Sequence, residues 1–587
     1  MGSKRSAREV AGTCQAGARH VPGTSLARAG HLPGYHLPVA VSAAGVAAIV
    51  FIFFLQTIGF PFLNWDDADI FVHNPALHAP GFIRWAFTTT YVEHFQPGAW
   101  LVWGAVDRAW GLTPTAAHSI TVVLHTACAA LVLLLGEHLG LDRAARVIGA
   151  LLFALHPLRV EVVAWASAMP YSLALLFALL STLIFLEPQR TALLTTTSVA
   201  LFAASLLARP VAFGLPVVLW VLDVRRNRVR RLTPFVVLAV GAVFLESRAR
   251  VTATFAEVGA GARFTLACTA PFKYLWRTIV PVKLTPLDPL ALTPRGDLPL
   301  ALASAAALGT LTWIAWRWRR EFPRSFAAWI SYLALLLPAV GLVPSGLQAT
   351  ADRYTYFSAV PLSLWLAAAA VRPSVVSGVR RTSVAASAVV IASLAILSYQ
   401  QMQYWRSSIA LWTRAVDIDP RSDLARYNLA SAFAEAGRRD AAVAQYDEVL
   451  HLVPDHRDAR RNRDLLRAAQ LEDEANGLAA SGKLDEAIAR YREAIGLDPA
   501  RTHSQAALGM ALVQSRRTAE AVEPLRAAIR LGALEPAIPK ALAFALVMNG
   551  RTREACDVLE TAHARFPSDP DVARNRQQLS RECGEGR

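Results

Sequence analysis

Residues 38–59 read PVAVSAAGVAAIVFIFFLQTIG, and residues 64–75, which follow almost immediately, read NWDDADIFVHNP. The first stretch has no charged side chain over a length that suffices to cross a bilayer as a helix. The second carries three carboxylates, Asp66, Asp67 and Asp69, close together in the sequence. Because a charge near hydrocarbon is costly unless it is paired or solvated, this junction predicts a membrane protein with a polar functional site at the bilayer surface.

Apolar segments of the same character recur up to about residue 400, where the composition changes. We predict eleven helical spans, at 38–59, 115–136, 145–158, 168–186, 191–208, 211–224, 232–247, 299–317, 326–344, 354–371 and 381–399. The predicted fold is all-α, with a polytopic membrane domain over residues 38–400 and a second domain over 401–587. An apolar piece at 264–281 is expected to be an interfacial helix, because a twelfth span would invert everything after it.

The distribution of charge excludes nucleic acid as a partner. The chain has a formal net charge of +15, but residues 401–587 contain equal numbers of acidic and basic side chains, so the excess lies before them. There it forms short clusters between apolar runs, the pattern of cytoplasmic loops. No segment interleaves aromatic and basic residues as a nucleic-acid groove would. The basic tail 1–37 is predicted to be cytoplasmic.

With eleven spans, the basic clusters fall on the cytoplasmic side and the remaining connections on the other. The clusters assigned to the cytoplasm are at 143–146, 190, 225–231, 317–324 and 372–381. The predicted external segments are the acidic loop 60–114, the turn 158–166, the segment 248–298, the loop 345–353 and the C-terminal domain. We expect a multi-pass protein of a bacterial inner membrane, with the C-terminal domain in the periplasm, and the lack of an Asn-x-Ser/Thr sequon fits this.

Residues 401–587 repeat with a period of about 34 residues, the length of a tetratricopeptide repeat. Pro420 and Pro454 lie one period apart, as expected of prolines that end the second helix of a unit. We predict about four units, a preceding half-repeat at 407–420, and eleven additional residues around 455–466. The first unit has Leu429, Ala430, Phe433, Gly437, Ala442 and Tyr446 at its packing positions. Such an α-solenoid binds an extended polypeptide.

Further along the chain, residues 153–165 read FALHPLRVEVVAW and residues 351–356 read ADRYTY. Together with 64–75, in this order and joined to repeats, these blocks resemble the TMTC-like family of transmembrane proteins with tetratricopeptide repeats, which is related to the GT-C glycosyltransferases. FQP at 95–97 and GLTP at 111–114 also fit the pattern. The resemblance covers nearly the whole chain from residue 40 onward.

The resemblance implies a GT-C fold whose first external loop carries an acidic pair. Such enzymes transfer a sugar, commonly mannose, from a polyprenyl-phosphate carrier to an acceptor hydroxyl, often that of Ser or Thr. The chain departs from the family at two places. Residues 167–171 read SAMPY where the family usually carries an Arg/Lys-Asp pair, and Arg209-Pro210 stands where a Lys is typical. The first departure removes a charged couple that could touch the donor, whereas the second retains the charge.

Sugar transfer from a phosphate ester needs a base for the acceptor hydroxyl and a cation for the departing phosphate. We predict Asp66 and Asp67 as the catalytic pair. Asp66 would take the acceptor proton, with Asp67 and Asp69 positioning it, because adjacent side chains point in different directions. The alternative for these carboxylates is a solvated turn that caps a helix. Asp66, Asp67 and Glu161 are also candidate ligands for a divalent metal ion, the one cofactor that the sequence suggests.

Two arginines are candidates for binding the donor phosphate. Arg353 lies in the external loop 345–353, and Arg209 lies between apolar spans near the same face. The planar guanidinium group suits a phosphate, and the alternative for both side chains is interfacial snorkelling. Lys273 and Arg277, on the expected interfacial helix, are weaker candidates that would more readily contact lipid head groups.

Glu161 stands four residues after Pro157 at a membrane-edge turn, with His156 and Arg159 beside it. We predict that these residues support the site, with Glu161 facing the acidic loop across a cavity. The alternative is an ion pair inside a helix junction.

The favoured hypothesis is an integral-membrane glycosyltransferase of the GT-C type. It would transfer a mannose-like sugar from a polyprenyl-phosphate donor to a protein hydroxyl that the repeats present. The competing hypothesis is a non-catalytic membrane scaffold whose repeats recruit an envelope protein. Eleven spans with charged external segments exceed what an anchor requires, whereas the missing charged couple near Met169 favours the scaffold. A transporter would carry more ionisable residues at mid-membrane depth.

Overall fold

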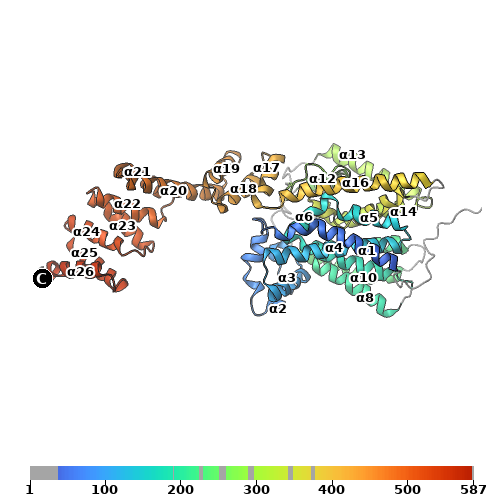
Figure 1. Ribbon diagram of the computed structural model, residues 1–587, viewed down its shortest axis with the longest axis horizontal. Helices are drawn as coiled ribbons and strands as arrows, with labels where there is room; N and C mark the ends of the chain where they lie inside the picture. The colour runs from blue at the N-terminus through green and yellow to red at the C-terminus, as the bar shows by residue number, and fades with distance from the viewer. Residues whose placement is uncertain are drawn as a thin grey trace, which may run out of the picture.

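The computed structural model describes residues 37–188, 191–223, 229–249, 259–288, 297–341, 348–371 and 377–584. In these ranges every regular element is a helix, which confirms the predicted all-α class. Figure 1 shows a bundle of helices and a curved array of helix pairs that leads away from it toward the C-terminus. The predicted basic tail up to residue 36, and the basic positions at 190, 225–228 and 372, lie outside the described residues.

The bundle is built from long helices joined by short helical turns. Its α-helices are α1 (Leu37–Phe54), α2 (Phe82–Thr88), α3 (Pro97–Trp110), α4 (Pro114–His138), α5 (Arg143–Ala154), α6 (Val160–Ala164), α7 (Met169–Leu186), α8 (Ala192–Ala208), α9 (Leu215–Asp223), α10 (Val229–Ala249), α12 (Ala260–Ile279), α13 (Leu298–Arg317), α14 (Pro323–Leu336), α15 (Ala359–Ala370) and α16 (Ser377–Tyr404). The short turns are η1 (Leu55–Gly59), η2 (Ala68–Val72), η3 (Pro75–Leu77), η4 (Tyr91–Glu93), η5 (Pro157–Arg159), η6 (Ala166–Ala168), η8 (Leu337–Ala339) and η9 (Asp352–Thr355).

Each of the eleven predicted spans coincides with a helix, but among the described residues only five helices are long and apolar enough to cross a membrane. These five are Pro38–Gly59, Pro114–His138, Ala166–Leu186, Leu298–Arg317 and Arg381–Tyr404. Most of the others are too short. For example, α9 has 9 residues, a rise of about 14 Å, whereas the hydrocarbon core measures about 30 Å. Length therefore supports five full spans rather than eleven.

A sixth apolar span is broken by a bend of 56° between Arg143–Ala154 and Pro157–Ala164. The bend has a local cause, because a proline disfavours helical geometry in the residue before it. His156 accordingly has φ −82° and ψ 138°. The segment after the bend turns aside from α5 and packs against η9 and α16.

The predicted external loop 60–114 is largely helical rather than extended. Its helix α3 starts at Pro97, a residue suited to the first turn, and packs against α2 and α8. Trp100 and Trp103 of this helix are fully buried. The sequence predicts only that this stretch is external, because it lacks a long apolar run. Buried tryptophans supply the core that a loop would lack.

Three of the long apolar helices have little of their surface buried inside the protein. The buried share of the most apolar window is 28% in Pro38–Gly59, 6% in Leu298–Arg317 and 11% in Arg381–Tyr404. A protein in water rarely exposes apolar surface on this scale. These outward faces are the surfaces that the sequence assigns to lipid.

The C-terminal array consists of antiparallel helix pairs. Its helices are α17 (Ser408–Ile418), α18 (Asp423–Glu435), α19 (Arg439–Leu452), α20 (Arg457–Ala480), α21 (Leu484–Leu497), α22 (Thr502–Gln514), α23 (Thr518–Arg530), α24 (Ala537–Met548), α25 (Thr552–Arg565) and α26 (Pro570–Gly584). The pairs α18–α19, α20–α21, α22–α23 and α24–α25 form four units, with α17 as the preceding half-repeat. The predicted solenoid is confirmed, and α26 packs on the last unit.

The eleven additional residues lengthen a helix instead of forming a loop. The first helix of the unit α20–α21 has 24 residues, whereas the corresponding helices α18 and α22 have 13 each. Eleven residues are close to three full turns of a helix. The insertion therefore leaves the packing face of α20 in phase with its neighbours.

A left-handed backbone conformation joins the two helices of each unit. Gly437, Gly482 and Gly550 have φ values of 72°, 81° and 73° in these turns. The third unit carries Arg516 at the same place, with φ 60°. A residue with a Cβ atom is strained in this conformation, whereas glycine is not.

We expect the substitution G482A to lower the free energy of unfolding by about 1–2 kcal/mol, because it imposes this strain. R516G should relieve it and raise the thermal midpoint slightly. A matched control is G477A in the interior of α20, where a Cβ would meet no atom within 4 Å and alanine is favoured by about 0.5–1 kcal/mol. Thermal unfolding of the full chain in detergent, followed by circular dichroism, measures all three. Equal midpoints for G482A and G477A would contradict the assignment.

Candidate functional site

Asp67 ties the acidic loop to the turn between α6 and α7. Its side chain is fully buried. One carboxylate oxygen accepts a hydrogen bond from the backbone N–H of Leu63 at 2.9 Å, and the other accepts from the backbone N–H of Ser167 at 3.0 Å and from the Ser167 hydroxyl. Ser167 thus anchors the acidic loop.

Burial changes the acidity of Asp67. It raises the pKa of this carboxyl to about 7, although hydrogen bonds from Ser167 and from the Leu63 and Ser167 backbone act in the opposite direction. The neighbouring Asp66 carboxylate raises the pKa further. A group that titrates near neutral pH can accept and release a proton under physiological conditions.

The three carboxylates of the loop have different surroundings. Asp66 is half-buried, and its backbone carbonyl accepts a hydrogen bond from Ile70 at 2.9 Å. Asp69 lies apart, with a side chain that is 64% exposed and 3.8 Å from the His73 ring. Asp67 is thus a buried anchor, whereas the neighbouring Asp66 is more accessible.

Trp165 connects the acidic loop with a group of charged residues. Its ring stacks on Trp65 of the loop, with centroids 4.9 Å apart and planes inclined by 24°. The Arg353 guanidinium lies over the same ring, 5.2 Å from the centroid. The loop and Arg353 are therefore held near one another although no hydrogen bond joins them among the contacts described here.

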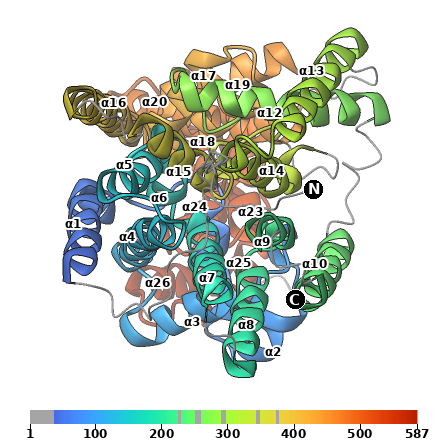
Figure 2. The same ribbon diagram turned by 90° about the vertical axis from the view of Figure 1, so that its right-hand side faces the viewer.

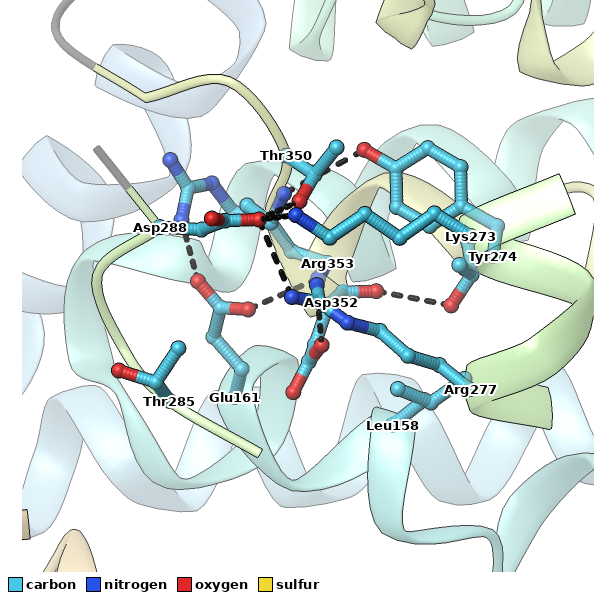
Figure 3. A network of polar contacts seen from close by, with 12 residues as sticks. Leu158, Glu161, Lys273, Tyr274, Arg277, Thr285, Asp288, Thr350, Asp352 and Arg353 are labelled. Atoms are coloured by element: carbon cyan, nitrogen blue, oxygen red, sulfur yellow. Dashed lines mark hydrogen bonds and ion pairs between the residues drawn. The ribbon is translucent and has the colours of Figure 1, made fainter. Parts of the chain in front are cut away.

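A buried network of charges follows Arg353 (Figure 3). Its backbone N–H donates to one oxygen of Glu161 at 2.9 Å, and its Nη1 donates to the other. Its Nη2 donates to Gln348 at 2.9 Å. The Glu161 side chain is 2% exposed and that of Arg353 is 10% exposed. The alternative interpretation of Glu161 as an ion-pair partner is thus realised, but across two segments far apart in the sequence.

The second half of the network joins α12 to the segments before α13 and α15. Arg277 donates to Asp352 at 3.3 Å and to Asp288 at 3.1 Å. Lys273 and Thr350 also donate to Asp288. Figure 3 shows these side chains converging from three segments of the chain. The sequence marked Lys273 and Arg277 as minor candidates and missed Asp288, since nothing near it forms a motif. Asp352 directly precedes the predicted Arg353, and this adjacency in the sequence could have indicated that Asp352 belongs to the site.

The two aspartates of this network respond oppositely to their surroundings. Burial raises the pKa of Asp352 to about 7, while Arg277 opposes the increase. Burial would also raise the pKa of Asp288, but Lys273, Thr350 and Arg277 hold it below its usual value. Asp288 is therefore the charged partner of the two basic residues on α12.

His156 and Arg159 lie at the same bend. His156 is buried, with Nε2 2.9 Å from the Thr278 carbonyl oxygen and Nδ1 accepting from the Leu158 N–H. Arg159 is 1% exposed and donates from Nη2 to Thr355. Its Nε and Nη1 atoms have no hydrogen-bond partner among the described residues. Arg159 thus carries a buried positive charge with free donors next to the network.

Arg209 lies at a separate corner of this region. It donates from Nη1 to Gln96 at 2.7 Å, and its Nη2 is 2.8 Å from the His94 ring. Its guanidinium also lies 4.9 Å from the ring centroid of Tyr171. Arg209 is therefore engaged with the helical loop 60–114, and the structure does not bring it into contact with Arg353.

The predicted metal ligands do not form a ligand set in the part of the chain that the structure describes. No group of three His, Cys, Asp or Glu side chains there could hold a metal ion. Both oxygens of Asp67 and both of Glu161 already accept hydrogen bonds from nitrogen donors. The arrangement of these carboxylates therefore does not fit a divalent ion, and the metal ion stays a prediction from the sequence.

The acidic loop also contacts the repeats directly. The Asn64 N–H donates to the Ser408 hydroxyl at 3.0 Å, and the Asn64 side chain donates to the Asn428 carbonyl at 3.1 Å. Trp412 Nε1 donates to Asn64 Oδ1 at 2.7 Å. The rings of Trp65 and Trp412 lie 5.1 Å apart. The loop that carries Asp66 is therefore held between the bundle and the first two helices of the repeat array.

Comparison with known proteins identifies the repeats. A family model described as tetratricopeptide repeat matches residues 394–470 and 472–536, so this part of the chain consists of tetratricopeptide repeats. No curated protein matches the chain. The chain thus contains tetratricopeptide repeats, which follow a bundle of helices.

Several solved structures of repeat proteins are similar to the chain at a low level. One is the MamA RS-1 ArsTM double mutant, with 18% identity over 28% of this chain and 86% of that one and a TM-score of 0.18. Another is YrrB, described as a TPR protein with an unusual peptide-binding site. It is 14% identical over 33% of this chain and 89% of that one, with a TM-score of 0.19. The TPR domain of P58(IPK) is 11% identical over 67% of this chain and 95% of that one, with a TM-score of 0.21. These values carry no argument about function.

The Glu161–Arg353 pair should dominate the stability of the bundle. E161Q leaves the buried Arg353 guanidinium without a charged partner and should cost about 3–5 kcal/mol, read as a large drop in the thermal midpoint. The double variant E161Q/R353Q should lose less than the sum of the single losses. The matched control is E493Q, which removes the exposed ion pair between Arg490 and Glu493 and should cost less than about 1 kcal/mol. Similar losses for E161Q and E493Q would contradict the pairing.

The raised pKa of Asp67 predicts a pH-dependent stability. Between about pH 4 and about pH 7 the folded chain keeps a proton that the unfolded chain releases, so the contribution of Asp67 to the free energy of unfolding falls as the pH rises. D67N removes this titration. The thermal midpoint of the wild type minus that of D67N should therefore decrease from pH 4.5 to pH 7.5. A difference that stays constant or increases would refute the assignment.

Proposed function

We propose that the protein is an integral-membrane glycosyltransferase of the GT-C type. It transfers a mannose-like sugar from a polyprenyl-phosphate donor to a hydroxyl group of a protein that the repeats bind. The reaction type is the one that the family resemblance of the sequence implies. The reaction would take place at the group of residues around Trp165.

A membrane location is supported by the apolar helices. The outward faces of α1, α13 and α16 would be unfavourable in water and favourable in lipid. The segments expected outside the cytoplasm also meet at one end of the bundle, because the acidic loop, the bend at Glu161 and the segments around Asp288 and Arg353 all lie in contact. On this basis the site faces the periplasm, together with the repeats.

Asp66 is the proposed general base. It is half-buried beside Asp67, and the buried Asp67 carboxyl holds the loop against Ser167. In the reaction, the acceptor oxygen forms a bond to the anomeric carbon of the sugar while the bond from that carbon to the phosphate oxygen breaks. Asp66 takes the proton of the acceptor hydroxyl, and the polyprenyl phosphate departs with the bonding electron pair. Asp67 acts as a positioning residue.

The departing phosphate needs a cation. The network offers Arg353, which was the predicted donor-phosphate residue but is already paired with Glu161. Arg159 adds a positive charge whose Nε and Nη1 have no partner among the described residues, but its side chain is 1% exposed, so it would act on the phosphate through its field rather than through direct hydrogen bonds. The group of Arg159, Lys273, Arg277 and Arg353 also has one positive charge more than its acidic partners Glu161, Asp288 and Asp352. That excess would attract an anion.

The observation that carries the proposal is the contact between the acidic loop and the repeats. Asn64 and Trp65 immediately precede Asp66 and bind directly to α17 and α18. Tetratricopeptide repeats are protein-binding modules, so an acceptor polypeptide on the repeats would be delivered next to the proposed base. An anchor alone would not need this arrangement.

A non-catalytic scaffold is the second candidate. It is favoured by the hydrogen bonds that already occupy both oxygens of Asp67 and Glu161. It is also favoured by residues 167–171, SAMPY, which lack the charged pair that the resembling family usually carries there. In this case the buried network would only stiffen the junction between bundle and repeats.

Substitution of Asp66 distinguishes the two. D66N should reduce sugar transfer to envelope proteins by about 100-fold or more, the usual cost of losing a general base, with the thermal midpoint almost unchanged. D67N should reduce both transfer and stability, because it breaks the anchor to Ser167. Transfer is measured in cells as the mass shift of envelope proteins, after membrane insertion of each variant has been verified.

The control is D485N, which alters an exposed carboxylate on α21 whose side chain is 88% exposed and should leave transfer unchanged. Full glycosylation in cells that carry D66N would reject the enzymatic proposal and leave the scaffold. Loss of glycosylation with both D66N and D485N would point to a nonspecific defect and would also count against Asp66 as the base.

A further inference from the structure

A cavity of about 680 Å³ lies inside the bundle, away from the site around Trp165. Helices α4, α7, α9, α14 and α15 enclose it. Figure 2 looks at the end of the bundle that faces away from the repeats and shows these five helices arranged around its centre. The volume falls in the range of about 300–1,000 Å³ that is typical of small-molecule sites.

Away from its rim the cavity is lined mainly by apolar side chains, with Thr182 and Ser331 as polar ones. Ala178, Val218, Leu335 and Leu364 contribute from four different helices. An apolar cavity of this size does not bind water well, because water needs polar partners. The lining therefore selects a flexible apolar chain as the occupant.

One rim of the cavity is basic. Arg319, Arg320 and Arg324 line it, in the connection between α13 and the first turn of α14. Arg319 donates to the Trp316 carbonyl at 2.7 Å and lies 3.9 Å above its ring. Arg320 and Arg324 are exposed, and in the described part of the chain neither forms a hydrogen bond or an ion pair. Two guanidinium groups are thus available to a ligand.

The acidic and titratable groups of the same rim do not cancel this charge. Asp223, at the end of α9, lines the cavity and has interactions of its own. His138, at the end of α4, lies 3.2 Å from Glu187. Three arginines exceed the lining Asp223 and the neighbouring exposed Glu321, which does not line the cavity, so the rim is net positive. Guanidinium groups bind phosphate oxygens in a bidentate manner.

We propose that this cavity binds an anionic phospholipid, with an acyl chain between α7, α9, α14 and α15 and its phosphate on Arg320 and Arg324. The apolar lining and the basic rim are the two halves of one amphiphile. The rim belongs to the cluster 317–324 that the charge pattern assigns to the cytoplasmic side, where anionic head groups are located. The lipid would fill the space that the short helix α9 leaves open and would thereby stabilise the bundle.

This lipid site does not depend on the proposed glycosyltransferase activity. It lies at the far ends of α4 and α7, whereas Ser167 and the acidic loop lie at the beginning of α7. The failure of one proposal would therefore leave the other intact.

The test is retention of phosphatidylglycerol by the full-length protein. The wild type, purified in a mild detergent after exposure to vesicles of phosphatidylglycerol, should carry it at about one molecule per chain in native mass spectrometry. Vesicles of phosphatidylcholine should leave about ten-fold less bound lipid, because its quaternary ammonium group offsets the phosphate charge and is repelled by the arginines. The double variant R320Q/R324Q should retain about ten-fold less phosphatidylglycerol than the wild type.

Two further variants keep the outcome interpretable. R317Q removes an exposed arginine of the same cluster that does not line the cavity and should retain lipid like the wild type. A327F places a ring in the cavity from α14 and should abolish retention while all arginines remain.

Equal retention by wild type and R320Q/R324Q, or by wild type and A327F, would overturn the proposal. A rise in thermal midpoint with inorganic phosphate alone, equal to that with phosphatidylglycerol, would also overturn it, because the site would then bind a simple anion.

Discussion

The buried ion pair between Glu161 and Arg353 is the interaction on which the arrangement of the bundle depends. Two charges removed from water are tolerable only if each finds its partner and the remaining donors and acceptors are satisfied. Here the backbone N–H of Arg353 and the side chain of Gln348 complete that requirement. The pair therefore fixes the bend after Pro157 against η9, two segments that are almost two hundred residues apart in the chain.

A chain of ring contacts connects this ion pair with the acidic loop and the repeats. Arg353 lies over Trp165, Trp165 stacks on Trp65, and Trp65 packs against Trp412 of the repeats. Aromatic surfaces of this size bury large apolar areas with defined geometry. The acidic loop is consequently held at a fixed place between the bundle and the repeat array, whereas most loops lie on the surface in contact with water.

The bundle has two ends with different chemistry. At the end next to the repeats, carboxylates and guanidinium groups pair with one another and leave one excess positive charge around Arg159. At the other end, short helices leave a mainly apolar cavity with a basic rim, where Arg320 and Arg324 form no ion pair within the described ranges. The cavity exists because helices such as α9 are too short to extend through the whole length of the bundle.

The sequence by itself determined the elements and their class. Period and proline spacing were enough for the repeats, because each unit packs only on its neighbours, and the positions of the eleven apolar helices followed from composition. It also predicts that Asp67, Glu161 and Arg353 lie in external segments. Only the tertiary structure decided their partners, since the contacts of Asp67 with Ser167 and of Glu161 with Arg353 join segments with no local pattern. The number of full spans, the burial of Asp67 and the role of Asp288 likewise depend on how helices pack, and packing is not encoded in any single stretch of the chain.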